Sequence, residues 1–269
     1  TDAYADESDS DLESDDLFLD LRGTRRWERG STGLRAYLSR ESILYSELVA
    51  AEPLDPNVED PVAVDTGRLV QLDEDRDRIT LAPYVNLQIS ERSSVVIDAR
   101  YLDISYTGDS TSGRSDFTDT LFSTGIERQI DDRNSATARL IFSTFEADAN
   151  SNITDTIGVE GSFAREVSDV WTFLLTTGLR RSDISFIDPQ QQLVEDVDTN
   201  FALSLGFRKR TDRSTLNLDV QRLIDPNSSG FLEQRDEFRI SVRRQMSPTL
   251  TGGVAFRVID SSTLGDVRG

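Results

Sequence analysis

The chain contains no cysteine and no histidine among its 269 residues. Without cysteine it forms neither disulfide bonds nor thiolate metal sites. Without histidine it lacks the commonest general base, the commonest metal ligand and every catalytic arrangement of the Ser-His-Asp type. It also contains no nucleotide-binding glycine motif and no nucleophile elbow. We therefore expect a protein that is not an enzyme and that uses neither a cofactor nor a metal.

Positive charge is scarce as well, because 29 lysines and arginines stand against 49 acidic residues, for a net charge of −20. This balance argues against nonspecific binding to nucleic acid, which requires a basic surface. No run of about 18 apolar residues occurs, which excludes a transmembrane helix. The sequence opens without a methionine or a signal peptide, so we take it as a mature or trimmed chain.

The acidic residues are dense at the start of the chain, where residues 1–16 carry small and acidic side chains almost throughout. Such a composition predicts a disordered tail or a long surface loop. We expect residues 17–269 to form a single domain.

Apolar and polar residues alternate from residue 17 onward. The clearest case is 201–221, where a turn at 211–214 separates two alternating runs. Their apolar positions are Phe201, Leu203, Leu205, Phe207, Leu216, Leu218 and Val220. This pattern predicts a β-hairpin with one apolar and one polar face. It recurs in about twelve segments of roughly 10–14 residues, far longer than the globular average of about 5–6 and close to the 9–11 that cross a bilayer.

The predicted connections alternate in length. Short ones fall near residues 28–31, 91–93, 131–134, 166–169, 211–213 and 246–248. Longer, acidic ones fall near residues 47–77, 107–116, 146–152, 183–198 and 225–236. Short turns at one end and long loops at the other are typical of outer-membrane barrels. The sequence thus predicts an all-β, antiparallel, up-and-down transmembrane β-barrel in a Gram-negative-type outer membrane, with periplasmic turns and external loops. Pro83, inside a predicted strand, requires a bulge to be accommodated.

One face of the predicted strands is expected to contact lipid. We assign to it Leu203, Leu205, Leu218, Val220, Ile240, Val242 and Val254. The alternative is a soluble, acidic, extracellular β protein. These rows disfavour it, because a soluble fold would expose them as large apolar patches unless a second sheet covered them.

Several segments resemble a known family. They are the turn Glu91–Ser94, the stretches Leu218–Arg222 and Pro226–Gly230, the pair Arg235–Asp236, and the segments Asp65–Gly67 and Leu72–Arg76. They resemble outer-membrane β-barrel proteins of bacterial exopolysaccharide-export gene clusters, over the span from Leu17 to Asp260. The resemblance implies a barrel with a role in moving or anchoring a polysaccharide, and it supplies no catalytic residues.

The sequence departs from this family at its ends. The final residues, Asp266 to Gly269, lack the terminal aromatic residue of such barrels. The first predicted strand resembles a strand from the middle of a barrel. We therefore expect the barrel to be incomplete at both ends.

The polar faces carry many arginines, which we expect to line the lumen. They are Arg22, Arg35, Arg78, Arg100, Arg139, Arg180, Arg208, Arg239 and Arg257. One interpretation is an ion- or sugar-selective lumen, because charged rings set pore selectivity and arginine binds carboxylates and phosphates through two parallel bonds. The other is a filled barrel held by cross-strand ion pairs. The near-interleaving of acids with bases favours the second.

Charge also differs between the two ends. Bases gather near the short turns, at Arg25, Arg26, Arg29, Arg128, Arg133, Arg165, Lys209, Arg210, Arg213, Arg243 and Arg244. They either draw an anionic polymer inward or, as we prefer, meet phospholipid headgroups. The loop acids are Asp55, Glu59, Asp60, Asp73, Glu74 and Asp75. They lack an EF-hand spacing, which favours solvated loops, or loops bridged to lipopolysaccharide by divalent ions, over a dedicated Ca²⁺ site.

Two functions remain open at this stage. The first is a non-enzymatic, porin-like barrel that acts as a pore or an export and assembly component, with exopolysaccharide as the cargo that the resemblance implies. The second is a structural anchor for a larger envelope or surface assembly. The expected partners are outer-membrane lipid and lipopolysaccharide, with an anionic polysaccharide or envelope assembly proteins as further candidates. The sequence predicts no oligomeric state.

Overall fold

The computed structural model describes residues 17–42, 75–107, 114–148, 151–187, 192–226, 230–247 and 249–263. The predicted acidic tail, residues 1–16, lies outside these ranges, as do the loop acids Asp55, Glu59, Asp60, Asp73 and Glu74. In the part of the chain that is described, no helix is long and apolar enough to cross a membrane.

Twelve strands make up the described structure. They are β1 (Leu17–Trp27), β2 (Gly30–Ser42), β3 (Asp75–Ser90), β4 (Ser93–Thr107), β5 (Phe117–Asp131), β6 (Asn134–Ala147), β7 (Asn152–Ser168), β8 (Trp171–Ile187), β9 (Leu193–Arg210), β10 (Ser214–Pro226), β11 (Leu232–Ser247) and β12 (Leu250–Thr263). Their lengths run from 11 residues in β1 to 18 in β9. Several strands are therefore longer than the sequence predicted.

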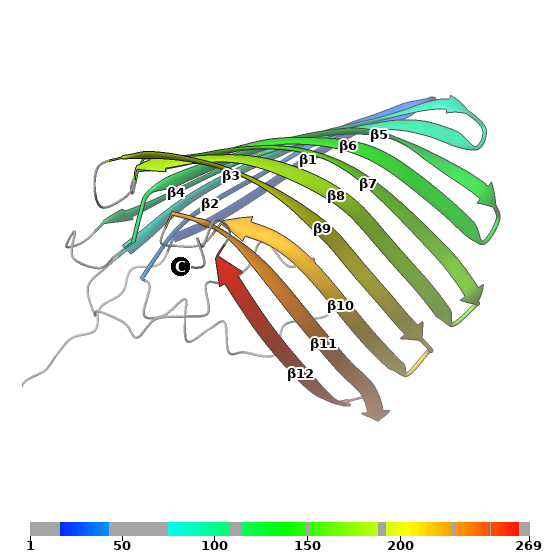
Figure 1. The fold of residues 1–269 in the computed structure, drawn as a ribbon. Coiled ribbons are helices and arrows are strands. Elements are labelled where there is room, and N and C mark those ends of the chain that lie inside the picture. Colours follow the sequence, from blue (N-terminus) through cyan, green and yellow to red (C-terminus); the bar gives the residue numbers. More distant parts are fainter. Residues whose placement is uncertain are drawn as a thin grey trace, which may run out of the picture.

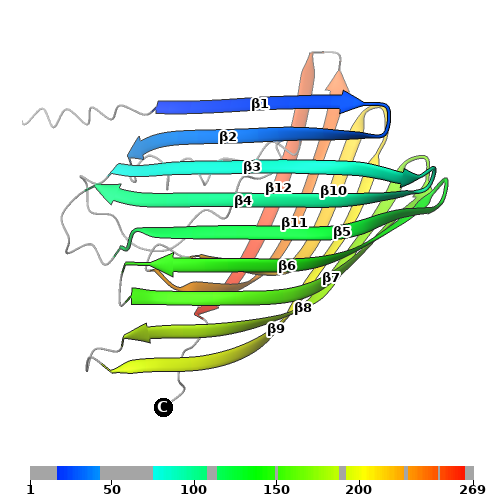
Figure 2. The same ribbon diagram turned by 90° about the horizontal axis from the view of Figure 1, so that it is seen from above.

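The strands form one antiparallel sheet in chain order, each paired with the next, which confirms the all-β, up-and-down fold. The sheet curls strongly, as Figure 1 shows, so that β10 to β12 face the concave side of the earlier strands. Among the described residues β1 and β12 are not paired with each other, so each is an edge strand. Figure 2 shows these two strands crossing at a wide angle.

The connections sort to the two ends of the sheet as predicted, with the tight turns gathered at one end in Figure 2. In the turn between β5 and β6, the Arg133 backbone N–H and the Asn134 side-chain amide donate hydrogen bonds of 2.8 Å to Asp131. These bonds stabilise the ionised carboxylate and hold the pKa of Asp131 below its ordinary value. The turn is thus locked by its own side chains.

Two of the predicted loops, 183–198 and 225–236, are shorter in the structure. The second is shorter because β10 ends at Pro226 and β11 begins at Leu232. β8 continues to Ile187 and β9 begins at Leu193, with Asp183 opposite Val197 inside the region predicted as a loop. The prediction treated the acidic residues as a loop signal. A charge on the solvent-exposed side of a strand is compatible with the ladder, because the backbone still forms its hydrogen bonds and the side chain remains in water.

Pro83 is accommodated without the expected bulge. On one side it pairs with Leu34 of β2. On the other side the β3–β4 pairs include Leu81 with Tyr101 and Tyr84 with Asp98, in one unchanged register. No pair forms at Pro83 itself on that side, which is where proline has no N–H to donate. The ladder is therefore interrupted there and resumes without an inserted residue.

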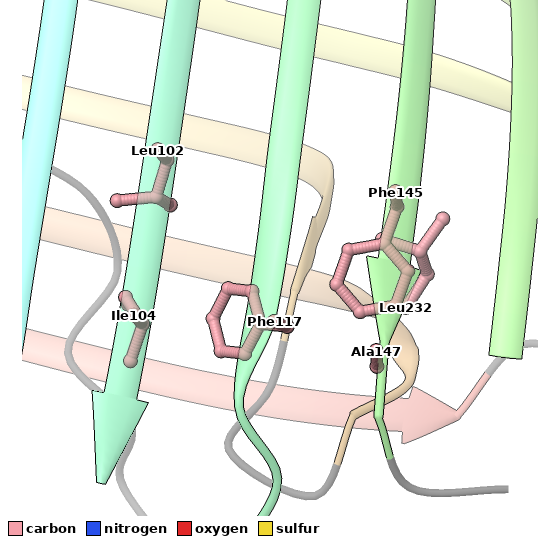
Figure 3. Close-up of a cluster of buried hydrophobic side chains, with 6 residues drawn as sticks. All are labelled: Leu102, Ile104, Phe117, Phe145, Ala147 and Leu232. Carbon is pink, nitrogen blue, oxygen red and sulfur yellow. The ribbon is translucent and has the colours of Figure 1, made fainter. Parts of the chain in front are cut away.

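A cluster of buried apolar side chains lies on the concave face near the loop end, as Figure 3 shows. It consists of Leu102, Ile104, Phe117, Phe145, Ala147 and Leu232. Leu232 belongs to β11, whereas the others belong to β4, β5 and β6, so the cluster joins two walls of the curled sheet. The alternation that places Arg100 inward also places Leu102 inward, and the inner face is therefore not polar throughout.

A short segment before β11 reinforces this junction. The Asn152 side-chain amide, at the start of β7, donates a buried hydrogen bond of 2.7 Å to the Gly230 carbonyl. Gly230 has a φ of 79°, in the left-handed region that glycine adopts without strain. The chain thereby turns inward and delivers Leu232 to the cluster.

Candidate functional site

The outer face of the sheet carries an apolar belt with charged boundaries. On β11 the outward side chains are Asp236, Phe238, Ile240, Val242 and Arg244. The two charged residues are eight positions apart, which at about 3.4 Å per residue spans roughly 27 Å of strand. A tilt of about 35–45° reduces this to roughly 20 Å, near the apolar band of about 25 Å in membrane barrels. The spacing is therefore of the same order as the apolar band of a membrane barrel.

The boundary charges have opposite signs at the two ends. At the loop end the outward residues include Asp103, Asp155, Asp183 and Asp236. At the turn end they include Arg128, Arg165, Lys209 and Arg244. Between Asp155 and Arg165 on β7, Ile157 and Val159 lie exposed on the same face. The belt thus has an acidic and a basic rim.

The residues predicted to face lipid fall on this belt. Val220, Val242 and Val254 are exposed, with Val254 at 77%. Leu203, Leu205, Leu218 and Ile240 are half-buried. The ladder pairs Leu205 with Val220 and Leu218 with Ile240, which places them in outward-facing rows.

The concave face holds a cavity of about 500 Å³ between the two walls of the sheet. Its lining includes six arginines and two carboxylates, namely Arg35, Arg78, Arg100, Arg180, Arg235, Arg257, Asp119 and Glu237. Phe145 and Leu232 also line it, so the apolar cluster bounds the cavity toward the loop end. The cavity is accordingly a polar space beside an apolar barrier.

Glu237 organises the wall formed by β11 and β12. Its side chain is 1% exposed and accepts two hydrogen bonds of 2.9 Å from Arg257. The guanidinium groups of Arg239 and Arg235 approach the same carboxylate to 3.3 and 3.8 Å. A buried carboxylate requires such pairing. The Glu237 carboxylate therefore holds the guanidinium groups of Arg235, Arg239 and Arg257 in fixed positions on this wall.

The opposite wall carries cross-strand ion pairs. Arg100 contacts Asp119 at 2.7 Å, Arg139 contacts Asp98 at 3.6 Å, and Arg180 contacts Glu160 at 3.5 Å. The first and third pairs join neighbouring strands, whereas Arg139 on β6 reaches across β5 to Asp98 on β4. The ion-pair lattice that the sequence suggested is therefore present on this wall.

Arg78 differs from its neighbours. It is 8% exposed, its Nε donates a 3.3 Å hydrogen bond to Thr80, and its guanidinium carbon lies 5.6 Å from the centre of the Tyr37 ring. Within the described residues it forms no ion pair with a carboxylate. Its charge is thus buried against an aromatic ring and a hydroxyl group, at the edge of the cavity.

The nine arginines predicted to line the lumen are not equivalent. Arg35, Arg78, Arg100, Arg180 and Arg257 line the cavity, and Arg139 and Arg239 form ion pairs beside it. Arg22 lies on the edge strand β1, exposed and paired with Asp20. Arg208 lies near the turn end, where its Nε donates to the Asn217 side chain. Sequence reasoning missed Arg235, although its spacing of two from Glu237 places it on the same face.

The chain was also compared with known proteins. No protein-family model matches it, and no curated protein matches its sequence. In fold it is similar to the ferric enterobactin receptor PfeA from Pseudomonas aeruginosa, with 9% identity, a TM-score of 0.48, and coverage of 93% of this chain and 51% of that chain. The ferric-catecholate import receptor Fiu from E. coli K12 gives 8% identity, a TM-score of 0.43, and coverage of 92% and 53%. The chain thus spans about half the length of these receptors, and the likeness is one of fold alone.

Proposed function

We propose that this chain forms the wall of a β-barrel that spans an outer membrane and provides a polar passage, without catalysing a reaction. The observation that carries the proposal is the outer belt of exposed apolar side chains, bounded by charges whose spacing is close to the height of a membrane barrel's apolar band, on strands of up to 18 residues. In water such a belt would be a large exposed apolar patch, whereas in a bilayer its side chains contact the apolar lipid chains.

The charges at the two rims of the belt support one orientation of the barrel in the membrane. The basic rim, which includes Arg165 and Arg244, lies at the end with the tight turns. Basic side chains are stabilised beside anionic lipid headgroups. Short turns face the periplasm in outer-membrane barrels. Both features support a periplasmic turn end and an external loop end.

The finer part of the proposal is that the barrel serves as a pore or as an export and assembly component for an exopolysaccharide. Two features support it. The first is the resemblance of segments such as Glu91–Ser94 and Leu218–Arg222 to barrels of exopolysaccharide-export gene clusters. The second is the cavity, whose arginines and hydroxyl groups suit a polar cargo.

Extraction from membranes tests the membrane assignment. The full chain, expressed with an export signal, should sediment with outer membranes and dissolve only in detergent. Before boiling it should migrate on a gel at a different position from the boiled chain, because the hydrogen-bonded sheet resists unfolding. Recovery in the soluble periplasmic fraction, with no shift on boiling, would contradict the proposal and favour a soluble β protein.

A structural anchor is the second candidate, and the apolar cluster favours it. Leu232 crosses the interior to contact the wall formed by β4 to β6, which obstructs part of the lumen. Conductance in a planar bilayer separates the two functions, because a pore passes current and a closed anchor does not. Leu232→Ala should increase the conductance if the cluster is the obstruction.

A further inference from the structure

We infer that the arginine-lined cavity is a binding site for an acidic saccharide unit, one that carries a carboxylate on a polyol ring. This inference rests on the proposed function, because it takes the cavity to lie in the lumen of the barrel. It names the class of cargo, which the fold by itself leaves open.

The first argument is the charge of the lining. Six arginines and two carboxylates line the cavity, so cations prevail on both walls. Arg100 and Arg180 are partly neutralised by Asp119 and Glu160 on the same wall. Arg78 is almost fully buried but forms no ion pair among the described residues, because Glu41, the carboxylate that attracts it, is bound to Arg76 at 2.8 Å. A buried guanidinium that no carboxylate contacts is costly, and an anionic ligand would supply that contact.

The second argument is unused hydrogen-bonding capacity. The Nε atoms of Arg100 and Arg180 are buried and have no acceptor within the described residues. Such donors are uncommon in folded proteins and are usually satisfied by water, an ion or a ligand. Arg100 and Arg180 both line the cavity, so these two donors lie where an anion would enter.

The third argument concerns the uncharged lining. Hydroxyl groups of Thr80, Ser143 and Thr156, together with the Gln221 amide, lie around the same space as the Tyr37 and Phe145 rings. Hydroxyl and amide groups match the alternating donors and acceptors of a sugar, and aromatic faces match its C–H surface. A bare phosphate ion would use only the arginines. The volume of about 500 Å³ is within the roughly 300–1,000 Å³ of ligand pockets.

The experiment measures binding by calorimetry on the full chain in detergent. The probes are trigalacturonate, which is acidic, maltotriose, which is a neutral trisaccharide of the same length, and inorganic phosphate. Trigalacturonate should bind more tightly than either, and its affinity should decrease as salt increases. Arg78→Gln should weaken its binding about tenfold, the loss expected for one charge-assisted hydrogen bond.

Arg181→Gln is the matched control. Arg181 is an exposed arginine on the outer face, paired with Asp183 at 3.3 Å, and its loss should leave trigalacturonate binding unchanged. Arg35→Gln, at another arginine that lines the cavity, is a second variant in case Arg78→Gln does not fold, and the gel shift on boiling reports folding for each. The comparison of the three probes on the wild-type protein tests the inference even if neither variant folds.

Three results would overturn the inference. They are equal affinity for trigalacturonate and maltotriose, equal loss of binding in Arg78→Gln and Arg181→Gln, or phosphate binding as tight as that of trigalacturonate. The last would leave a generic anion site. A protein that shifts on boiling but binds no probe refutes only this inference. One that needs no detergent and shows no shift refutes the proposed function as well.

Discussion

The ring of Tyr84 on β3 lies directly across Gly33, its register partner on β2. A Cβ atom on Gly33 would lie 2.7 Å from Tyr84 Cζ and closer still to Cε1. The ring extends over the glycine far enough that its hydroxyl lies 3.3 Å from Thr24 Oγ1 on β1. Glycine weakens a strand by itself, and an aromatic ring packed over it compensates. This contact therefore ties three strands together on the concave face.

Gly33→Ala should destabilise the sheet, because the methyl group would displace the Tyr84 ring. The expected loss is about 1–3 kcal/mol, typical of overpacking. The measurement is the temperature at which the unboiled gel band converts to the boiled one. Gly23→Ala is the control, since nothing lies within 4 Å of a Cβ there. Adding Tyr84→Ala should remove most of the difference between the two variants, and an unchanged difference would contradict the contact.

Charge on the outer belt should be poorly tolerated. Ile240 lies midway between Asp236 and Arg244, next to Leu218 and Phe256 in the ladder. Ile240→Arg should cost about 2–4 kcal/mol near the bilayer midplane. Ser241→Arg, one position along, points to the concave side and should cost much less. Denaturant titration in lipid vesicles measures both. Equal tolerance would mean that the belt does not face lipid.

The alternation of residues predicted most of the fold, because a period of two fixes which side chains share a face. It also placed five of the nine predicted lumen arginines around one cavity, among them Arg78 and Arg257. What it did not predict depends on curvature. Leu102 and Phe145 follow the same alternation, but Leu232, four positions before the outward-facing Asp236, would face outward by alternation and is instead buried against them at the start of β11. The lack of an ion pair at Arg78 likewise depends on geometry, because Glu41 on the neighbouring strand contacts Arg76 instead.

The two edge strands should not remain open in a membrane. Every backbone group in lipid requires a hydrogen-bond partner, because water is absent. In lipid vesicles, amides of β1 and β12 should therefore exchange as slowly as those of β7 at the centre of the sheet. Fast exchange along either edge would contradict a bilayer location. Because the chain lacks cysteine, a disulfide scan from Leu19→Cys against β12 positions would show whether the two edges meet each other.

The final prediction concerns the charge that a permeating ion experiences. Arg100, Arg139 and Arg239 lie mid-strand on the concave face, each in contact with a carboxylate. In a confined passage of low dielectric constant, such charges act more strongly than the screened acids at the surface. The wild-type protein should therefore pass anions in preference to cations in a planar bilayer. Neutralising all three arginines to glutamine should shift the reversal potential toward cation selectivity, because their carboxylate partners remain.

The pairing of Arg100 provides the control for this prediction. Asp119 is almost buried, and Arg100 contacts it at 2.7 Å. Arg100→Gln alone leaves a buried carboxylate without this partner, and should lower stability as well as anion selectivity. Adding Asp119→Asn removes the charge that was left behind, so both properties should return toward the wild type. A selectivity unaffected by the triple substitution would mean that these arginines act only as lattice residues. No current from the wild-type protein would mean that the apolar cluster around Leu232 closes the interior, as a structural anchor requires.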